Sequence, residues 1–325
     1  MLEFIIRRCL QAVLVLFVMT LLVFFGVNVI GNPVYIFASS ECTQACLNAI
    51  SADLGLDQPI WEQYRRFLVG LVQGDLGRSF TYGIPAMTLI WERFPATLEL
   101  ALAALIIALG VGLPLGVFAG LRPRSLFSKA IMGFSMLSFS VPVFWIGLIM
   151  ILVFSVNLGW LPAIGRAQPV NLLGLPVTFL TLDGLRHLAM PAFTLSLVML
   201  AIVIRLTRAG MSEVLHADYI KFARANGIRE SRVIGVHVMK NIMIPIVTVL
   251  GMEFGGVIAF AVVTESIFSW PGVGKMLIDA IAVLDRPLIV AYLVFVVVMF
   301  VALNLLVDIV YSLLDPRIRV GGGAR

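Results

Sequence analysis

Charged side chains are scarce in this sequence. Asp, Glu, Lys and Arg make up 13% of the 325 residues, apolar residues make up 61%, and the mean hydropathy is +1.05. Soluble domains usually carry about 25% charged residues. The deficit predicts that lipid surrounds most of the chain. It argues against a soluble protein whose apolar helices are buried in a core.

Motifs for catalysis and metal binding are also missing. The sequence has no His-rich metal motif, no Gly-x-Ser-x-Gly and no Walker A loop. The nearest phosphate-loop lookalike, 271–276, has Ser269 where the first Gly belongs and Met276 where a Ser or Thr would hold Mg²⁺. We therefore expect no enzyme, no metal and no bound cofactor. If ATP drives this protein, another subunit must bind the nucleotide and Mg²⁺.

Long apolar runs are what the sequence does have. A spanning helix needs about 20 mostly apolar residues. The first run is too long for the h-region of a signal peptide, roughly 7–15 residues, and no small-residue cleavage site follows it. We expect an all-α integral membrane protein in which Pro114 and Pro142 kink their helices. Its six spans are predicted at 9–30, 96–120, 130–156, 187–207, 244–268 and 288–311.

The distribution of Lys and Arg predicts the orientation. Short cytoplasmic loops carry an excess of both residues. If the N-terminus is placed in the cytoplasm, most of the 23 basic residues fall on the cytoplasmic side of the membrane, above all in 208–243. Both termini are therefore predicted to be cytoplasmic. The basic residues mark topology, so anionic lipid or a cytoplasmic protein is the expected neighbour, and nucleic acid is not.

The polar segment 31–95 is predicted to lie on the outer side of the membrane, opposite the cytoplasm. A helix is expected to begin after Pro59, a turn at Gly74 to Gly77, and a second short helix over 84–93, ended by Pro95. The segment is either a folded cap on the membrane or a loop packed on the bundle. Its cysteines, four residues apart, are either a local disulfide or two free thiols. These are Cys42 and Cys46; Cys9 is expected to be a small apolar residue of the first span.

The basic inside segment 208–243 has a pattern of its own. Asp218 to Gly227 is typical of a helix closed by glycine. A second helix is expected to begin at Ile228 and to run to Pro245 at the membrane. Small side chains before the glycine would let another protein approach closely. An ordinary basic loop would have a similar composition.

Residues 219–245, YIKFARANGIRESRVIGVHVMKNIMIP, resemble the coupling loop of binding-protein-dependent ABC importer permeases, in the dipeptide, oligopeptide and nickel branch. The Glu-Ala opening of the general family motif is absent, and Lys221-Phe222 stands there instead. The resemblance implies a helix–Gly–helix that docks on an ATPase subunit. The residues it implies for this contact are Tyr219, Ala223, Arg224, Ala225, Gly227, Ile228, Arg232, His237, Asn241 and Pro245.

The resemblance extends over nearly the whole chain and favours the paired permease with the long first outside segment. Further landmarks are LGLDQP at 54–59, GDLGRS at 74–79, PATLEL at 95–100, LGWLP at 158–162, FSWPGVG at 268–274 and DPRIR at 315–319. It implies that this chain forms one half of a heterodimeric translocation path in a bacterial inner membrane. The implied partners are a second permease, two ATPases that bind ATP and Mg²⁺, and a periplasmic or lipid-anchored binding protein. Peptides are the implied substrate. Nickel chelates, glutathione and other small solutes are the alternatives.

Ionisable residues inside spans are candidates for function. Glu253, Glu265 and Asp308 are such residues, although each could instead have a structural role. The resemblance implies that the fifth span lines the path, which favours Glu253 and Glu265. Ser138 and Ser140 beside Pro142 are weaker candidates.

Two glycine patterns predict closely packed helix faces. They are Gly112-x₃-Gly116-x₃-Gly120 and Gly251-x₃-Gly255. The contact is either internal or with a partner permease. An ion-coupled transporter would show internal repeats and a channel would show a filter, and the sequence has no sign of either.

Overall fold

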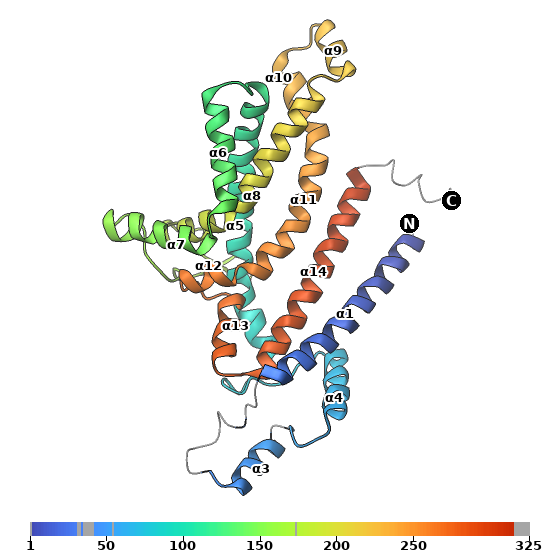
Figure 1. Ribbon diagram of the computed structural model, residues 1–325, viewed down its shortest axis with the longest axis vertical. Coiled ribbons are helices and arrows are strands. Elements are labelled where there is room, and N and C mark those ends of the chain that lie inside the picture. Colours follow the sequence, from blue (N-terminus) through green and yellow to red (C-terminus); the bar gives the residue numbers. More distant parts are fainter. Residues whose placement is uncertain (1, 31–33, 35–41, 54, 173, 315–325) are drawn as a thin grey trace. The chain divides into compact units, whose positions relative to one another are not determined.

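The computed structural model describes residues 2–30, 34, 42–53, 55–172 and 174–314. Helices make up almost all of this part of the chain (Figure 1). The elements are α1 (Leu2–Ile30), α3 (Gln44–Asp53), α4 (Ile60–Gln73), α5 (Ala86–Leu121), α6 (Leu126–Ser140), α7 (Val143–Met150), η1 (Ile151–Asn157), β1 (Val170–Leu172), β2 (Leu175–Val177), α8 (Leu182–Val214), α9 (Asp218–Ala225), α10 (Glu230–Arg232), η2 (Val233–Val238), α11 (Met239–Phe260), α12 (Val262–Ile267), α13 (Val273–Ala282) and α14 (Arg286–Leu314).

Four helical segments are long and apolar enough to cross a membrane: α5, α8, Glu230–Ile267, and Arg286–Val307 of α14. α6 and the helix Val143–Asn157 pass the same test as a pair and count as a fifth span if they form one. In α1 the described apolar stretch is the shorter Val13–Gly26. The described residues therefore give four to five of the six expected spans.

The predicted effect of proline on the helices is confirmed at Pro142 and wrong at Pro95. At Pro142 the chain breaks between α6 and α7 with a bend of 108°, so 130–156 is not one straight span. Pro95 was expected to end a short helix, and that prediction is wrong, because α5 runs through both Pro95 and Pro114. Prolines are tolerated in membrane helices because neighbouring groups satisfy the freed carbonyl.

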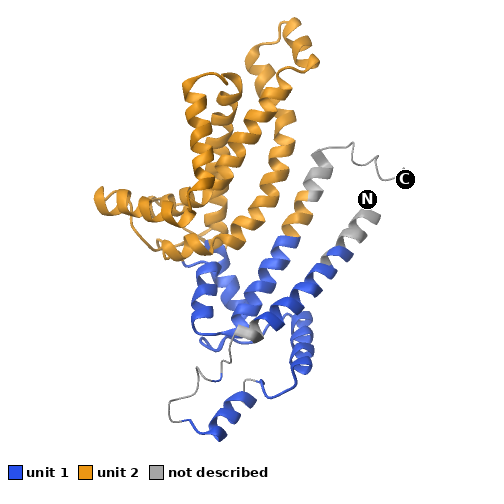
Figure 2. Ribbon diagram, in the orientation of Figure 1, with its two compact units in different colours: residues 1–96, 271–301 blue, residues 97–270, 302–325 orange. Residues whose placement is uncertain are grey.

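The chain divides into two compact units (Figure 2). Unit 1 contains Met1–Ala96 and Pro271–Val301, and unit 2 contains Thr97–Trp270 and Ala302–Arg325. Unit 1 therefore joins the expected outside segment to α13 and to the first part of α14. The terminal landmark 315–319 lies outside the described residues.

In unit 1, aromatic side chains pack α4 on α1. The Phe24 ring lies 5.2 Å from the Tyr64 ring and 5.6 Å from the Phe67 ring. Asp285, fully buried ahead of α14, accepts hydrogen bonds from the Ser79 hydroxyl and from the backbone N–H groups of Phe80 and Thr81. As expected, α4 begins directly after Pro59, and Gly74 follows its end with a φ of +76°.

In unit 2, α8 is the central helix. Of its apolar window 67% is buried, compared with 28–33% in the other three long spans. A Cβ atom on Gly112 would lie 2.8 Å from Val203, and one on Gly116 would lie 2.5 Å from Thr207. Gly120 faces Met211 in the same way, and Gly251 of α11 faces Val307 of α14. These glycine faces are therefore internal contacts.

We predict that Gly116→Val lowers the thermal stability of the detergent-solubilised protein, because the new side chain collides with α8. Overpacking of this kind costs about 1–3 kcal/mol. Gly110→Val is the matched control, since a Cβ on Gly110 of the same helix meets nothing within 4 Å. Equal melting temperatures for the two variants would contradict close α5–α8 packing.

Candidate functional site

The predicted helix–Gly–helix is confirmed. α9 ends at Ala225, and Gly227 has a φ of +74°, in the left-handed region that favours glycine. The Ile228 N–H donates to the Ala223 carbonyl at 3.2 Å, and the Gly227 N–H donates to the Arg224 carbonyl at 2.9 Å. The chain thus leaves α9 through a glycine cap and enters the second helix at α10.

The second helix is continuous with the bundle. α10, η2 and α11 follow one another without a gap, and Pro245 lies inside α11. Asn241 ties this helix to the first, because its Nδ2 donates to the Tyr219 hydroxyl at 2.9 Å and to the His237 carbonyl at 2.8 Å. Burial raises the pKa of Tyr219.

The loop that joins α8 to α11 has its own buried core. Ile220, Val233 and Val238 are fully buried, and Ala223 is 7% exposed. All four belong to the same apolar cluster as buried residues of α5, α8 and α11, and Ile228 packs against it. Ala223 is therefore small because it packs inside the loop, not because it faces a partner. The sequence-based interpretation was wrong for this residue.

The opposite face of the loop is exposed and holds most of the predicted coupling residues. Phe222 is 72% exposed and Tyr219 is 46% exposed. From the sequence, Phe222 was identified only as a departure from the family motif and not as a contact residue. An exposed aromatic side chain on a short helix is the signal that would have identified it. Also exposed on this loop are Arg224, Ala225, Gly227, Arg232 and Asn241.

An ion pair closes the loop across the glycine. Arg224 donates to both carboxylate oxygens of Glu230, at 2.6 and 3.1 Å. This hydrogen bonding lowers the pKa of Glu230 and raises the pKa of Arg224. Both side chains are exposed, so the pair contributes little to stability. The pair joins the last turn of α9 to the first residue of α10.

A second polar cluster in unit 2, which we call the Glu99 cluster, escaped the sequence analysis. The Glu99 carboxylate receives two hydrogen bonds from Arg166, at 2.6 and 3.1 Å, and three from Thr178 and Phe179. Arg166 also donates to the Pro176 carbonyl and lies over the Trp270 ring. The side chains of Glu99 and Arg166 are only 2% and 9% exposed.

Two of the sequence landmarks contribute residues to this cluster, together with a residue that follows a third landmark. The 95–100 segment supplies Glu99, the 268–274 segment supplies Trp270, and the segment after 158–162 supplies Arg166. In addition, the Gly165 N–H donates to the Phe268 carbonyl at 2.8 Å. The short hairpin of β1 and β2 lies in the same connection and was not predicted. The cluster thus fixes the loop between α7–η1 and α8.

The candidate path residues occupy different environments. Glu265 is fully buried and accepts a hydrogen bond from Thr97 at 2.5 Å, whereas Glu253 on α11 is half-buried. Ser138 is buried, Ser140 is exposed, and each donates to a carbonyl of its own helix. Pro142 is exposed at the bend between α6 and α7. The side chain of Asp308 lies outside the described residues.

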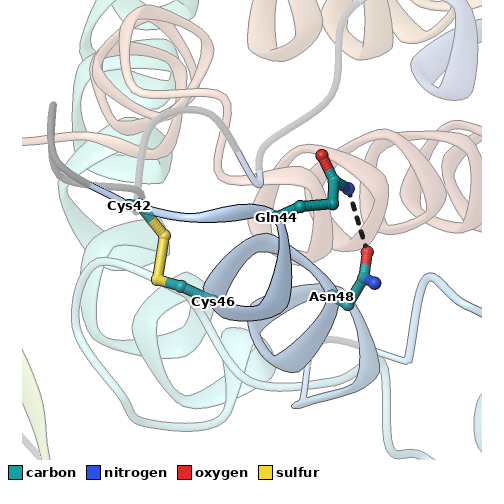
Figure 3. The surroundings of a disulfide bond; sticks show 4 residues. All are labelled: Cys42, Gln44, Cys46 and Asn48. Atoms are coloured by element: carbon teal, nitrogen blue, oxygen red, sulfur yellow. Dashed lines mark hydrogen bonds between the residues drawn. A yellow bond between two sulfur atoms is a disulfide. The ribbon is translucent and has the colours of Figure 1, made fainter.

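Figure 3 shows Cys42 joined to Cys46, at the start of α3, by a disulfide with 5.6 Å between the Cα atoms. Beside it, Gln44 donates to Asn48 at 3.1 Å. The side chain of Cys9 lies outside the described residues. Among the side chains that the structure describes, no group of three or more His, Cys, Asp or Glu residues is placed to hold a metal ion.

The comparisons with known proteins agree with a helical membrane fold. The family described as "Binding-protein-dependent transport system inner membrane component" matches residues 112–320, and the N-terminal family of such membrane components matches residues 1–101. The chain belongs to this family. It is a multi-pass helical component of an inner membrane and a permease subunit of an ABC importer, not the ATPase of its system.

Similar proteins match over nearly their full length. The dipeptide transport system permease protein DppB of Escherichia coli K12 is 39% identical, with 98% of this chain and 99% of the relative covered. The di/tripeptide permease DppB of Pseudomonas aeruginosa is 41% identical, with 98% and 99% covered. The oligopeptide permease AppB of Bacillus subtilis is 38% identical, also with 98% and 99% covered.

A solved structure shares the fold. A chain of the MetNI methionine ABC transporter, in an inward-facing conformation, superposes with a TM-score of 0.53. The match covers 70% of this chain and 97% of that chain at 14% sequence identity. At this identity the likeness shows the fold alone.

We predict that Arg166→Met destabilises the protein strongly, because it leaves the Glu99 carboxylate buried with fewer donors. Removing one partner of a buried ion pair costs about 3–5 kcal/mol. Arg186→Met, at an exposed position on α8, is the control. The melting temperatures of the two variants in detergent provide the measurement. If they are the same, the Glu99 cluster is not a structural anchor.

Proposed function

We propose that this chain is one half of a heterodimeric path that imports di- and oligopeptides across the inner membrane. Three relatives named as permeases of dipeptide, di/tripeptide or oligopeptide transport match the chain from end to end, and this similarity supports the choice of substrate. The partners in this proposal are a second permease, two ATP-binding cassette ATPases that hold ATP and Mg²⁺, and a periplasmic or lipid-anchored binding protein.

The topology that goes with this proposal has six spans. α1 adds the sixth to the four long helices and the bent pair, and both termini lie in the cytoplasm. The distribution of basic residues supports this orientation, since 208–243 and the tail 312–325 then share the cytoplasmic side. Residues 1–30 carry the first span, 31–95 form an outer subdomain, and 96–311 form the core permease domain.

The observation that carries the mechanism is the shared apolar core of the coupling loop and the bundle. Buried side chains of the loop pack in one cluster with α8 and α11. A force on the loop therefore moves these helices instead of being absorbed by a flexible connection. Well-packed interiors transmit displacement because they have low compressibility. In Figure 1, α9 and α10 stand at one end of α8 and α11.

The exposed face of the coupling loop is the proposed ATPase contact. Phe222 and Tyr219 project from it, and aromatic side chains are enriched among the residues that dominate binding energy at interfaces. When the ATPases close on ATP, the loop follows them and the helices rock between inward and outward access. The chain converts this motion into gating and performs no chemistry.

The proposed path residues are Ser138, Ser140, Pro142, Glu253 and Glu265. Among them, half-buried Glu253 is the better placed to meet the ammonium group of a peptide. Glu265 is engaged with Thr97 in this conformation. Contact between Glu265 and a substrate requires a state in which this pair opens.

We predict that Gly227→Val abolishes substrate-stimulated ATP hydrolysis by the reconstituted complex while the protein still inserts. No atom lies within 4 Å of a Cβ at this position, so the defect comes from the left-handed backbone. That conformation costs an L-residue about 1–2 kcal/mol, which shifts the population of the capped loop by a factor of roughly 5–30.

Gly227→Asn is the matched control, because asparagine tolerates the left-handed region. It should retain most of the stimulation. Full stimulation in the valine variant, or equal loss in both variants, would refute a coupling role that depends on the glycine cap.

A further inference from the structure

Arg205 of α8 is the one Lys or Arg residue that falls inside any of the six predicted spans. Charged residues within spans are costly in lipid, so they usually face the interior of a helix bundle or a water-filled cavity and mark a site. The transport mechanism above gives Arg205 no part. Its surroundings therefore decide what it could bind.

The guanidinium of Arg205 points into the membrane and not toward the cytoplasm. α8 continues from Arg205 to Val214, and helical side chains tilt toward the N-terminus of their helix, which in the proposed topology is the outer end of α8. The guanidinium carbon lies 4.3 Å from the centre of the Phe139 ring on α6. Phe139 is about 14 Å along the predicted span that begins at 130, near the middle of a hydrocarbon core of about 30 Å.

The N–H donors of this guanidinium are not used within the chain. Among the side chains that the structure describes, no carboxylate forms an ion pair with Arg205, and the Phe139 ring is its one interaction. An aromatic ring attracts a cation through its face but offers no oxygen or nitrogen acceptor. Arg205 is exposed, so the fork of five N–H groups is open to a ligand. A carboxylate has two oxygens that match this fork.

The helix break beside Phe139 favours water over lipid around Arg205. Regular helix stops after Ser140 and resumes at Val143, with a bend of 108°. Ser140 and Pro142 are exposed at this break, so the chain itself does not bury the irregular backbone. Such backbone at membrane depth is tolerated only inside protein or along a water-filled cavity, and discontinuous helices line substrate sites in other transporters.

We propose that Arg205 binds the C-terminal carboxylate of the peptide during translocation, while Phe139 holds the face of the guanidinium. This inference rests on the proposed function. A dipeptide carries one ammonium group and one carboxylate, and the path residues proposed above, including Glu253 for the ammonium group, contain no cation. Arg205 supplies the missing charge. It makes the path selective for peptides whose C-terminus is free.

The test compares import of labelled dialanine and of dialanine amide by the complete complex in proteoliposomes, with its binding protein and ATP. Arg205→Gln should lower kcat/KM for dialanine about tenfold, the loss expected for one charged hydrogen bond, and should leave import of the amide unchanged. Arg205→Lys should restore part of the loss, because lysine keeps the charge without the fork. Arg208→Gln is the matched control, since Arg208 lies on the same helix beyond the predicted span.

Three results would overturn the proposal. Equal effects of Arg205→Gln on the acid and the amide would show that the residue does not contact the carboxylate. Loss of the second permease from the purified Arg205→Gln complex would show that Arg205 pairs with that subunit. Failure of the wild type to import dialanine at all would refute the peptide substrate of the proposed function, and this site with it.

A second measurement needs no amide. Maleimide labelling of a Ser140→Cys variant, followed at that residue by mass spectrometry, should become slower when saturating dialanine is present. The added change Arg205→Gln should remove this protection. Protection of equal extent with and without Arg205, or none in either case, would contradict a carboxylate site beside the helix break.

Discussion

The close approach of α5 to α8 is the contact on which unit 2 depends. Between helices in lipid there is little hydrophobic driving force, so association rests on close packing of small residues. Gly112, Gly116 and Gly120 present bare backbone to Val203, Thr207 and Met211. α6, α7, α11 and α12 also pack on α8. The core of the loop between α8 and α11 is part of the cluster built on these contacts, so the loop and α8 share one packed core.

Closer to the start of α5, a polar interaction also holds neighbouring segments together. The Glu99 cluster satisfies a buried carboxylate completely, with five hydrogen bonds from Arg166, Thr178 and Phe179. Partly satisfied networks of this kind are costly, and fully satisfied ones specify a single arrangement. Unit 1 uses the same principle at Asp285, which accepts three of its hydrogen bonds from residues about 200 positions earlier in the chain. Unit 2 is therefore tightly packed along α8, and a buried ion pair holds the first half of α5 to the loop before α8.

Much of this architecture could be predicted from the sequence because the signals are local. Long apolar runs predicted the spanning helices, Pro59 predicted the start of α4, and Gly227 predicted the cap of α9. Glu99 and Arg166 could not be paired, because they are 67 residues apart and each alone is typical of an exposed residue. Pro95 misled the prediction, since membrane helices tolerate a proline that would end a soluble helix. Ala223 misled it as well, because a small residue fits a tight internal contact as readily as an external one.

The central claim is that this chain works as one half of a pore coupled to separate ATPases. Pull-down of the tagged chain from native membranes in gentle detergent, with mass spectrometry of the proteins that co-purify, tests it most directly. The account predicts a second permease of the same family together with ATPases that contain a Walker A loop. Recovery of the folded chain alone, or as a homo-oligomer, would contradict it and would favour an ion-coupled transporter.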